Sequence, residues 1–436
     1  MPTRTEPIPI FGQTQWRSAA DVLGSPHEPV RSLYIHVPFC FHKCHYCDFY
    51  SFVDSQDRQE SFVDALLIEI ESLAPHADQA AGLSTIFIGG GTPSLLRPDL
   101  WRRLLDAIHT QFKLDQIRAG DGEFTVECNP ETVTPELMTI LKTGGVNRVS
   151  VGAQSFNESH LKTLERWHDP ANVAKALQCA ADAGIERRSI DLIYAIPGQT
   201  LDDVASDLDI ALSMSPGVEH ISAYCLTYEP NTAMTRRVER GDIQPVDDDM
   251  CAEMQTLVAD TLRSAGFHRY EVSNFARRDE SGDHRRAVSQ HNLAYWRNQS
   301  WLAAGPSASG HVLSAQEGVD APAGARWKNA PRLTDWMEHV NATGASPVID
   351  VEPPDAERTL RERLMMGIRI DEGVPIDDVR TAVRALNCEA SLLLAAAQLA
   401  RDGLIEDDAN AWRLTERGFL FADGVASELM SAVSQP

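Results

Sequence analysis

Short runs of apolar and β-branched residues alternate with longer amphipathic stretches over the first 275 residues. The short runs predict six strands, at Leu33–Val37, Thr85–Ile88, Glu123–Cys128, Arg148–Gly152, Ser189–Ile193 and His220–Leu226. The amphipathic stretches predict helices, at Gln59–Leu73, Asp99–Phe112, Pro135–Thr143, Ala171–Ala183, Leu201–Met214 and Asp247–Ala265. Such alternation predicts an α/β fold with a parallel sheet. Six units are too few for a closed eight-stranded barrel, so we expect an open, partial barrel that binds ligands at the carboxyl ends of its strands.

The pattern changes after residue 275. A charged stretch, Arg277–Arg286, predicts a solvated loop, and an aromatic-rich segment runs from His291 to His311. The Pro-rich stretch Val351–Asp355 then leads into a small α-rich region. The elements predicted there are helices at Ala356–Ile368, Ile376–Ala385 and Glu389–Asp402 and a short hairpin around Ile405 and Trp412–Leu414. We therefore predict a lead-in (1–30), a partial barrel (31–275), a connecting segment (276–350) and a C-terminal winged-helix-like module (351–436).

Charge and hydropathy narrow the class of protein. The 436 residues include 39 Lys and Arg against 63 Asp and Glu, which gives a net charge of −24. This balance opposes a main role in nucleic-acid binding, which requires a basic face, and the C-terminal module is itself acidic. No apolar run approaches the length of a membrane span, and the N-terminus has no apolar core of a signal peptide. We therefore predict a cytoplasmic protein.

The eight cysteines suggest metal chemistry, because disulfides are rare in a reducing cytosol. Three of them, Cys40, Cys44 and Cys47, lie within eight residues directly after the first predicted strand. Thiolates at these spacings can ligate three irons of a 4Fe–4S cubane and leave one iron open for an exchangeable molecule. The alternative is a zinc site with His42 or His45 as a weak fourth ligand. The other cysteines are scattered along the chain, at Cys128, Cys179, Cys225, Cys251 and Cys388.

A glycine run, Gly89–Ser94 (GGGTPS), follows the second predicted strand. Glycines at a strand end let backbone N–H groups approach a ligand closely and form an anion-binding concavity. A tight turn explains the same residues equally well when the run is considered alone. The run gains meaning from its place one strand after the cysteine loop.

Together these motifs resemble the radical SAM superfamily. The resemblance extends to the oxygen-independent coproporphyrinogen III oxidase family, which includes heme chaperones of the HemW type. The segments that carry it, in the family's order, are Tyr34–Cys40, Gly89–Ser94, Glu127–Thr132, Arg148–Phe156 and Asp191–Thr200. The resemblance covers the chain from about Tyr34 to the C-terminal module. It implies a 4Fe–4S cluster whose open iron chelates S-adenosylmethionine (SAM), and one-electron cleavage of SAM to a 5′-deoxyadenosyl radical.

The resemblance also implies roles for individual residues, none of them catalytic. Cys40, Cys44 and Cys47 correspond to the cluster ligands. The positions that correspond to the SAM site are Tyr34, Tyr46, Gly90, Gly91, Thr92 and Glu127, with Tyr46 beside the adenine. The positions that hold a second SAM in the coproporphyrinogen enzymes correspond to Gln154, Arg166 and Asp191. The structural alternative for Asp191 is a strand-end residue that caps the following turn. Glu165 departs from the family pattern, which has a glycine before the arginine.

Two functions are compatible with the resemblance. One is oxidative decarboxylation of coproporphyrinogen III to protoporphyrinogen IX, and the other is a heme chaperone that hands heme to an acceptor protein. Coproporphyrinogen enzymes carry a fourth cysteine where this chain has Phe49, and they have a longer N-terminal segment. The chaperone is therefore our prediction. Its expected partners are heme, a heme-acceptor protein and an electron donor such as a flavodoxin or ferredoxin, with membrane contact only through the acceptor.

The segment His291–Trp296 (HNLAYW) matches the HNxxYW motif of the HemW-type proteins. An imidazole is a natural axial ligand for heme iron, and Tyr295 and Trp296 offer flat apolar surface for a porphyrin. We therefore predict a heme contact at His291, with His284 and His311 as rivals. The structural alternative is a turn with two aromatics buried between domains and a histidine bonded to the backbone.

Overall fold

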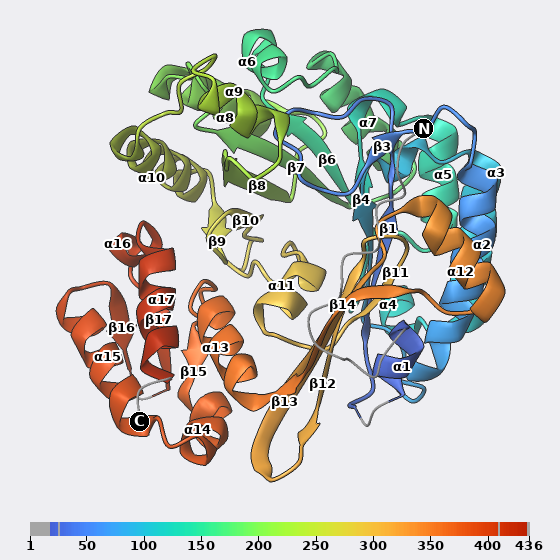
Figure 1. The fold of residues 1–436 in the computed structure, drawn as a ribbon. Helices are drawn as coiled ribbons and strands as arrows, with labels where there is room; N and C mark the ends of the chain where they lie inside the picture. The colour runs from blue at the N-terminus through green and yellow to red at the C-terminus, as the bar shows by residue number, and fades with distance from the viewer. Residues whose placement is uncertain (1–17, 25–26, 409, 434–436) are drawn as a thin grey trace.

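The computed structural model describes residues 18–24, 27–408 and 410–433. Its largest sheet has nine strands, with bounds β1 (Ser32–Val37), β4 (Thr85–Gly90), β5 (Glu123–Cys128), β6 (Arg148–Gln154), β7 (Arg187–Tyr194), β8 (His220–Cys225), β9 (Phe267–Arg269), β10 (Asn274–Arg277) and β11 (Leu302–Ala304). The strand order is β11-β1-β4-β5-β6-β7-β8-β10-β9. Strands β11 to β8 are parallel, whereas β10 and β9 add antiparallel pairs at one edge. The predicted α/β fold with an open, mostly parallel sheet is confirmed, and all six predicted strands are present (Figure 1).

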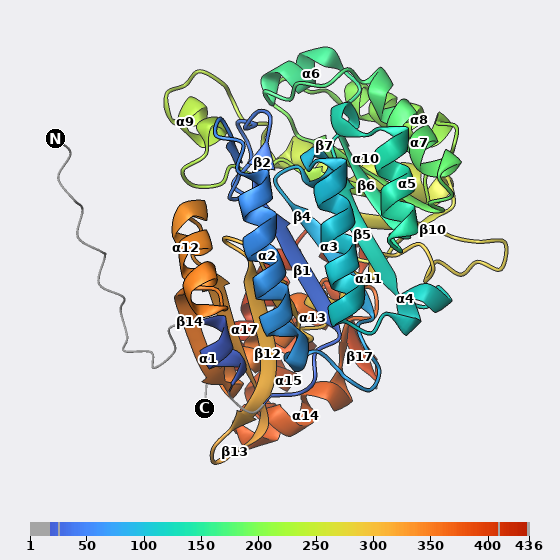
Figure 2. The ribbon, with the colours of Figure 1, turned by 90° about the vertical axis from the view of Figure 1, so that its right-hand side faces the viewer.

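Helices cover the outer face of the curved sheet (Figure 2). These helices are α2 (Gln59–Leu73), α3 (Pro98–Gln111), α5 (Pro135–Thr143), α7 (Ala171–Asp182), α8 (Leu201–Ser213) and α10 (Asp248–Ser264). Shorter helices of the same part of the chain are α1 (Ala19–Leu23), which packs against the second sheet, α4 (Asp115–Ala119), α6 (Glu158–Thr163) and α9 (Ala233–Glu239). Local chemistry fixes where several begin. The side chains of Thr134, Thr200 and Asp247 accept hydrogen bonds from backbone N–H groups in the first turns of α5, α8 and α10.

The segment that follows residue 275 is part of the barrel and not a separate connection. It contributes β11 to the main sheet, beside β1, and forms a second sheet. Its remaining elements are α11 (Gln290–Trp296), β12 (Ser309–Gln316), β13 (Val319–Asn329), α12 (Leu333–Thr343) and β14 (Val348–Asp355). The buried carboxylate of Glu69, on α2, accepts hydrogen bonds from the Gly305 N–H at 2.7 Å and the Asn329 amide at 3.0 Å. The Pro-rich stretch forms the end of β14, an edge strand, where a missing N–H is tolerated.

The C-terminal module is small, largely helical and built around its own core. Its elements are α13 (Ala356–Gly367), β15 (Val374–Pro375), α14 (Ile376–Ala385), α15 (Glu389–Arg401), β16 (Ile405–Asp407), β17 (Ala411–Leu414), α16 (Glu416–Phe419) and α17 (Ala422–Val433). Leu364, Leu392, Trp412 and Leu429 are among its buried core residues. The helix α17 was not expected from the sequence. The bounds of the four predicted segments stay a prediction. Within the described ranges, we find no helix with the length and hydropathy of a membrane span.

Candidate functional site

The three clustered cysteines lie in a loop at the carboxyl end of β1. The loop is bracketed by two short paired strands, β2 (Phe39–Cys40) and β3 (Phe52–Val53), and the Cys47 N–H donates to the Cys44 carbonyl at 3.3 Å. Thiolates on one tetrahedral zinc ion lie about 3.8 Å apart. The three Sγ atoms of this loop do not all lie within 4.8 Å of one another. The spacing therefore fits ligands of separate irons in a cluster better than ligands of a single ion.

Neighbouring polar groups donate hydrogen bonds to two of the three cysteine sulfurs. Burial raises the pKa of Cys40, and it raises the pKa of Cys47 to about 11. The Thr92 hydroxyl donates to Cys40 Sγ at 3.4 Å, and the Arg166 guanidinium donates to Cys44 Sγ at 3.8 Å. A hydroxyl and a cation aimed at sulfur stabilise thiolates, which are the form that binds iron. The donor set therefore fits a 4Fe–4S cluster.

The glycine run packs directly against the cysteine loop. The Gly91 N–H donates to the Val37 carbonyl at 2.8 Å, and the Thr92 N–H donates to the Phe39 carbonyl at 2.7 Å. Gly90 has φ +109°, and a Cβ there would lie 2.5 Å from the His36 ring. Only glycine fits this backbone and this approach without strain. The run thus serves as the floor of the cysteine loop as well as a candidate ligand surface.

Replacing Gly90 with alanine is expected to lower the free energy of unfolding by about 2–5 kcal/mol, because the positive φ and the overlap with His36 both cost energy. Gly120→Ala is the matched control, since Gly120 has φ +88° with nothing within 4 Å of the added Cβ. That control should cost only about 1–2 kcal/mol. Urea unfolding of the two variants measures the difference, and equal losses would contradict the close approach.

Two carboxylates, Glu127 on β5 and Asp191 on β7, lie inside the barrel and are close enough for the charge of Asp191 to act on Glu127. Burial, reinforced by Asp191, raises the pKa of Glu127 to about 7, and burial also raises the pKa of Asp191. Glu127 accepts the Gly90 N–H at 3.1 Å. Asp191 lies within β7 and accepts the Ser150 hydroxyl at 3.1 Å, so it bridges to a neighbouring strand and does not act only as a turn cap. Paired acids of this kind can accept ribose hydroxyls or pair with an ammonium group.

Sequence reasoning missed Arg148, the first residue of β6. Its side chain is buried, with 3% exposed, and its charge acts to lower the pKa of both Glu127 and Asp191. The available signal was an arginine opening an otherwise apolar strand. The positive charge of Arg148 offsets the negative charges of Glu127 and Asp191 in the barrel interior. This matters because an unpaired buried charge is costly.

The residues that match a second SAM position gather at the end of β6. Gln154 has φ +64°, and the Arg166 guanidinium donates to the Gly152 carbonyl at 3.2 Å. A Cβ on Gly152 would lie 2.8 Å from the Gln154 amide and 2.9 Å from Arg166, so both side chains cover this glycine. Glu165 itself adopts φ +54° at the position where the family has a glycine. The backbone there keeps the conformation that glycine favours, and Arg166 remains in place.

Two tyrosines complete the set of predicted SAM contacts. The Tyr34 hydroxyl bonds to His36 Nδ1 at 3.0 Å, and its ring lies 6.3 Å from that of Phe87. Tyr46 packs against a small apolar cluster that includes Leu164. Burial raises the pKa of both phenols, so they stay neutral hydrogen-bonding groups near neutral pH. The predicted SAM residues thus come from the strands and loops around the cysteine loop, and their roles stay a prediction.

His291 lies at the opposite end of the sheet. Its Nδ1 bonds to the hydroxyl of Thr85, the first residue of β4, at 2.8 Å, and its Nε2 bonds to the Tyr295 hydroxyl at 2.8 Å. Its ring stacks on Phe87 at 5.4 Å. Thr85 opens β4, so His291 lies beside the amino-terminal part of this strand, whereas the cysteine loop lies at the carboxyl ends of the strands. Both ring nitrogens are engaged, in side-chain bonds and not in the backbone bond of the structural alternative.

The two rival histidines have different surroundings. His311, on β12, is buried, and its Nδ1 lies 3.1 Å from the Gln299 carbonyl. His284 lies in the charged loop, beside His268 and Asp371, with ring centroids of the two histidines 4.0 Å apart. Neither rival lines the cavity next to α11.

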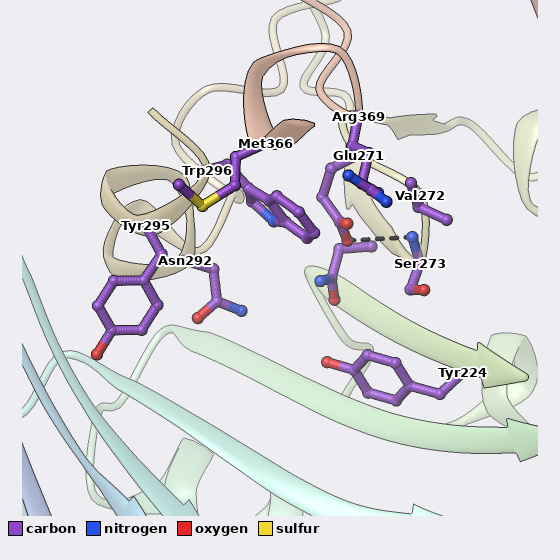
Figure 3. A pocket seen from close by; sticks show the side chains of 10 residues that line it. Tyr224, Glu271, Val272, Ser273, Asn292, Tyr295, Trp296, Met366 and Arg369 are labelled. Atoms are coloured by element: carbon purple, nitrogen blue, oxygen red, sulfur yellow. Dashed lines mark hydrogen bonds between the residues drawn. The ribbon is translucent and has the colours of Figure 1, made fainter. Parts of the chain in front are cut away.

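That cavity has a volume of about 400 Å³ and opens between α11, the end of β8 and the C-terminal module (Figure 3). Its lining residues are Tyr224, Glu271, Val272, Ser273, Asn274, Asn292, Tyr295, Trp296, Met366 and Arg369. The Trp296 indole and the Met366 thioether form an apolar wall, opposite the polar Glu271 and Arg369. The volume lies within the usual range for small-molecule sites, about 300–1,000 Å³. Burial raises the pKa of Glu271 to about 7, so its charge is sensitive to a bound ligand.

The chain was compared with known proteins. Residues 34–211 match the model of the radical SAM superfamily, and residues 355–421 match the HemN C-terminal domain. Several proteins named heme chaperone HemW are similar along nearly their whole length. The one from Mycobacterium tuberculosis is 36% identical over 93% of this chain and 96% of its own, and the Escherichia coli one is 32% identical over 91% and 97%.

A solved structure shows the same fold. The Escherichia coli coproporphyrinogen III oxidase HemN, described as a radical SAM enzyme, superposes with a TM-score of 0.75 over 94% of this chain and 92% of its own, at 22% identity. The superfamily implies a 4Fe–4S cluster and SAM, for which the cysteine loop and its surroundings provide a fitting donor set. The chain belongs to the HemW family of radical SAM proteins.

Proposed function

We propose that this protein is a heme chaperone that binds heme and a SAM-ligated 4Fe–4S cluster and transfers heme to an acceptor protein. The observation that carries the proposal is the similarity to heme chaperones at 31–36% identity across more than nine-tenths of the chain. Phe49 supports it, because its side chain stands, 60% exposed, where coproporphyrinogen enzymes have a fourth cysteine. We further propose a cytoplasmic location and a flavodoxin or ferredoxin as the electron donor.

In this proposal the cluster and heme occupy different parts of the barrel. Cys40, Cys44 and Cys47 hold the cluster, whose open iron takes SAM, and the predicted SAM contacts are Tyr34, Tyr46, Gly90, Gly91, Thr92, Glu127, Gln154, Arg166 and Asp191. Asp191 helps to raise the pKa of Glu127, so a cationic sulfonium ligand nearby would favour the ionised form of Glu127. The cluster, held by the three cysteines, would supply one-electron chemistry to SAM bound beside it.

We place the porphyrin in the cavity beside α11. Trp296 offers a flat apolar wall, and Arg369 lines the same cavity, where a propionate would share its guanidinium with Asp423, at 2.6 Å. Tyr295 lines this cavity and also bonds His291 Nε2, so rotation of one phenol would open the imidazole toward the cavity. Burial lowers the pKa of His291 to about 4, which keeps the ring neutral and its lone pair available for iron.

A heme titration tests this placement. Anaerobic protein with a reconstituted cluster is titrated with hemin, and the Soret band is followed for wild type, Trp296→Ala, His291→Ala and the control His339→Ala, which removes a histidine on α12. We expect Trp296→Ala to weaken heme binding about tenfold or more, and His291→Ala to shift the Soret band by removing the axial ligand. Unchanged affinity in Trp296→Ala would refute the placement. An unchanged spectrum in His291→Ala would refute the ligand and leave the histidine a packing residue.

The competing function is oxygen-independent coproporphyrinogen III oxidation, for which the HemN-like fold is the favouring observation. The same preparation, supplied with coproporphyrinogen III, SAM and a reductant, should release no carbon dioxide and form no protoporphyrinogen IX. Stoichiometric turnover without stable heme binding would reverse the proposal. Heme release to candidate acceptors is then followed by transfer of the Soret band between separable proteins.

A further inference from the structure

We propose that His268, His284 and Asp371 form a binding site for one transition-metal ion of the zinc type, separate from the cysteine loop. It is the one group of three potential ligand side chains within 4.8 Å of one another in the described ranges. Two imidazoles and one carboxylate are a ligand set that suits such ions, with remaining positions for water. None of the three residues lines the cavity beside α11.

The distances fit a metal site after small side-chain movements. Asp371 Oδ2 lies 2.6 Å from His268 Nε2 and 3.7 Å from His284 Nε2. Two ligand atoms on one tetrahedral zinc ion lie about 3.3 Å apart. An ion therefore needs the first pair to separate by about 0.7 Å and the second to close by about 0.4 Å. Each side chain is 23–27% exposed, so an ion can enter from solvent.

Three separate segments present the ligands, and the backbone fixes each one. His268 lies on β9, where it pairs with Ala276 of β10. Asp371 follows α13 in the C-terminal module, and its N–H donates to the Tyr270 carbonyl at 3.0 Å. His284 belongs to the loop after β10, where its carbonyl accepts the Ala287 N–H at 2.9 Å. A bound ion would therefore join the edge of the main sheet to the C-terminal module.

Without a metal ion, Arg278 holds His268 in a tautomer that cannot bind the ion through Nε2. Its guanidinium donates to His268 Nδ1 at 2.9 Å. Since arginine has no acceptor, His268 Nδ1 carries no hydrogen, and Nε2–H donates to Asp371. A metal ion needs the Nε2 lone pair, so its binding moves the ring hydrogen to Nδ1 and displaces the guanidinium. Arg278 is exposed and can swing into solvent. Removing it should therefore favour the ion, both by releasing the tautomer and by removing a positive charge.

The test measures zinc in cluster-loaded protein, because free thiols of the cysteine loop would bind zinc themselves. Full-length protein with a reconstituted cluster is dialysed anaerobically against a Zn²⁺ series, and zinc and iron per chain are counted together. We expect one zinc per chain beyond the cluster iron. His284→Ala and Asp371→Asn should weaken zinc binding at least about tenfold, and Arg278→Ala should tighten it. His339→Ala, which removes a histidine outside the group, should leave the affinity unchanged.

His284 lies in a solvated loop, so its loss leaves the fold intact, and Asp371→Asn keeps a polar partner for His268. Zinc should also raise the midpoint of thermal unfolding of wild type and not of His284→Ala. The proposal fails if cluster-loaded wild type retains no zinc, or if both ligand variants retain it with wild-type affinity. Weaker zinc binding in Arg278→Ala would show that the guanidinium supports the ion and would overturn the competition.

Discussion

Replacing Cys44 with alanine is expected to abolish the broad visible absorption of the reconstituted protein and to reduce its iron content to a small fraction of four per chain. Three thiolates hold the cluster in this proposal, and two are too few to retain a cubane against loss of iron. The Cys44 side chain is partly exposed, and its one described side-chain contact is the weak hydrogen bond from Arg166 at 3.8 Å. Its loss should therefore leave the apoprotein folded. Iron assay, absorption and far-UV circular dichroism measure these expectations.

Cys179→Ala is the matched control. Cys179 is also a partly exposed free cysteine, but it lies on α7, away from the cysteine loop. It should keep the full cluster absorption. A full cluster in Cys44→Ala would show that the ligands are misassigned, whereas a loss in both variants would indicate a general sensitivity of reconstitution to cysteine content. SAM binding, followed by its effect on the reduced cluster's magnetic resonance, should disappear with the cluster.

The features that the sequence predicted well are local ones. The cysteine loop and the glycine run each lie within eight consecutive residues, and each follows a strand whose apolar run is continuous, so parallel pairing brings them to one edge of the sheet. The bounds of α2 and α5 were predicted to the residue for the same reason, since the apolar residues of each lie on one buried face and, in α5, Thr134 provides a cap.

What the sequence did not reveal depends on distant partners. Strand β11 has only three residues, Leu302–Ala304, and nothing in so short a run distinguishes a sheet strand from a loop. The bonds of His291 join it to Thr85, 206 positions away, and only the folded chain brings the two together. The positive φ of Glu165 could not be predicted from the sequence either, because glutamate rarely adopts a positive φ. Tertiary contacts decide all three features.

Replacing Arg187 with alanine is expected to lower the free energy of unfolding by about 3–5 kcal/mol, because it removes the cation that pairs with the buried carboxylate of Glu123. The guanidinium donates to Glu123 Oε2 at 2.7 Å and to the Val288 carbonyl at 2.7 Å. Although burial acts to raise it, the charges of Arg187 and Arg148 hold the pKa of Glu123 below its usual value. The folded-state pKa is depressed, so this stability is present at neutral pH and is lost as the pH falls through that pKa. Urea unfolding at pH 7 and at pH 4 measures both effects.

Loss of Arg187 should also affect α11, the helix that carries the HNxxYW motif. Glu123 accepts hydrogen bonds from the N–H groups of Gln290 at 2.9 Å and His291 at 3.3 Å. Arg187→Ala should therefore loosen α11 and weaken heme binding as well as stability. Arg286→Ala is the matched control, since its pair with Glu186 is exposed and worth at most about 1 kcal/mol. The double variant Arg187→Met, Glu123→Gln removes both buried charges and should recover part of the lost stability. A double variant no more stable than Arg187→Ala would show that the packing of the arginine, and not its charge, holds α11 on the sheet.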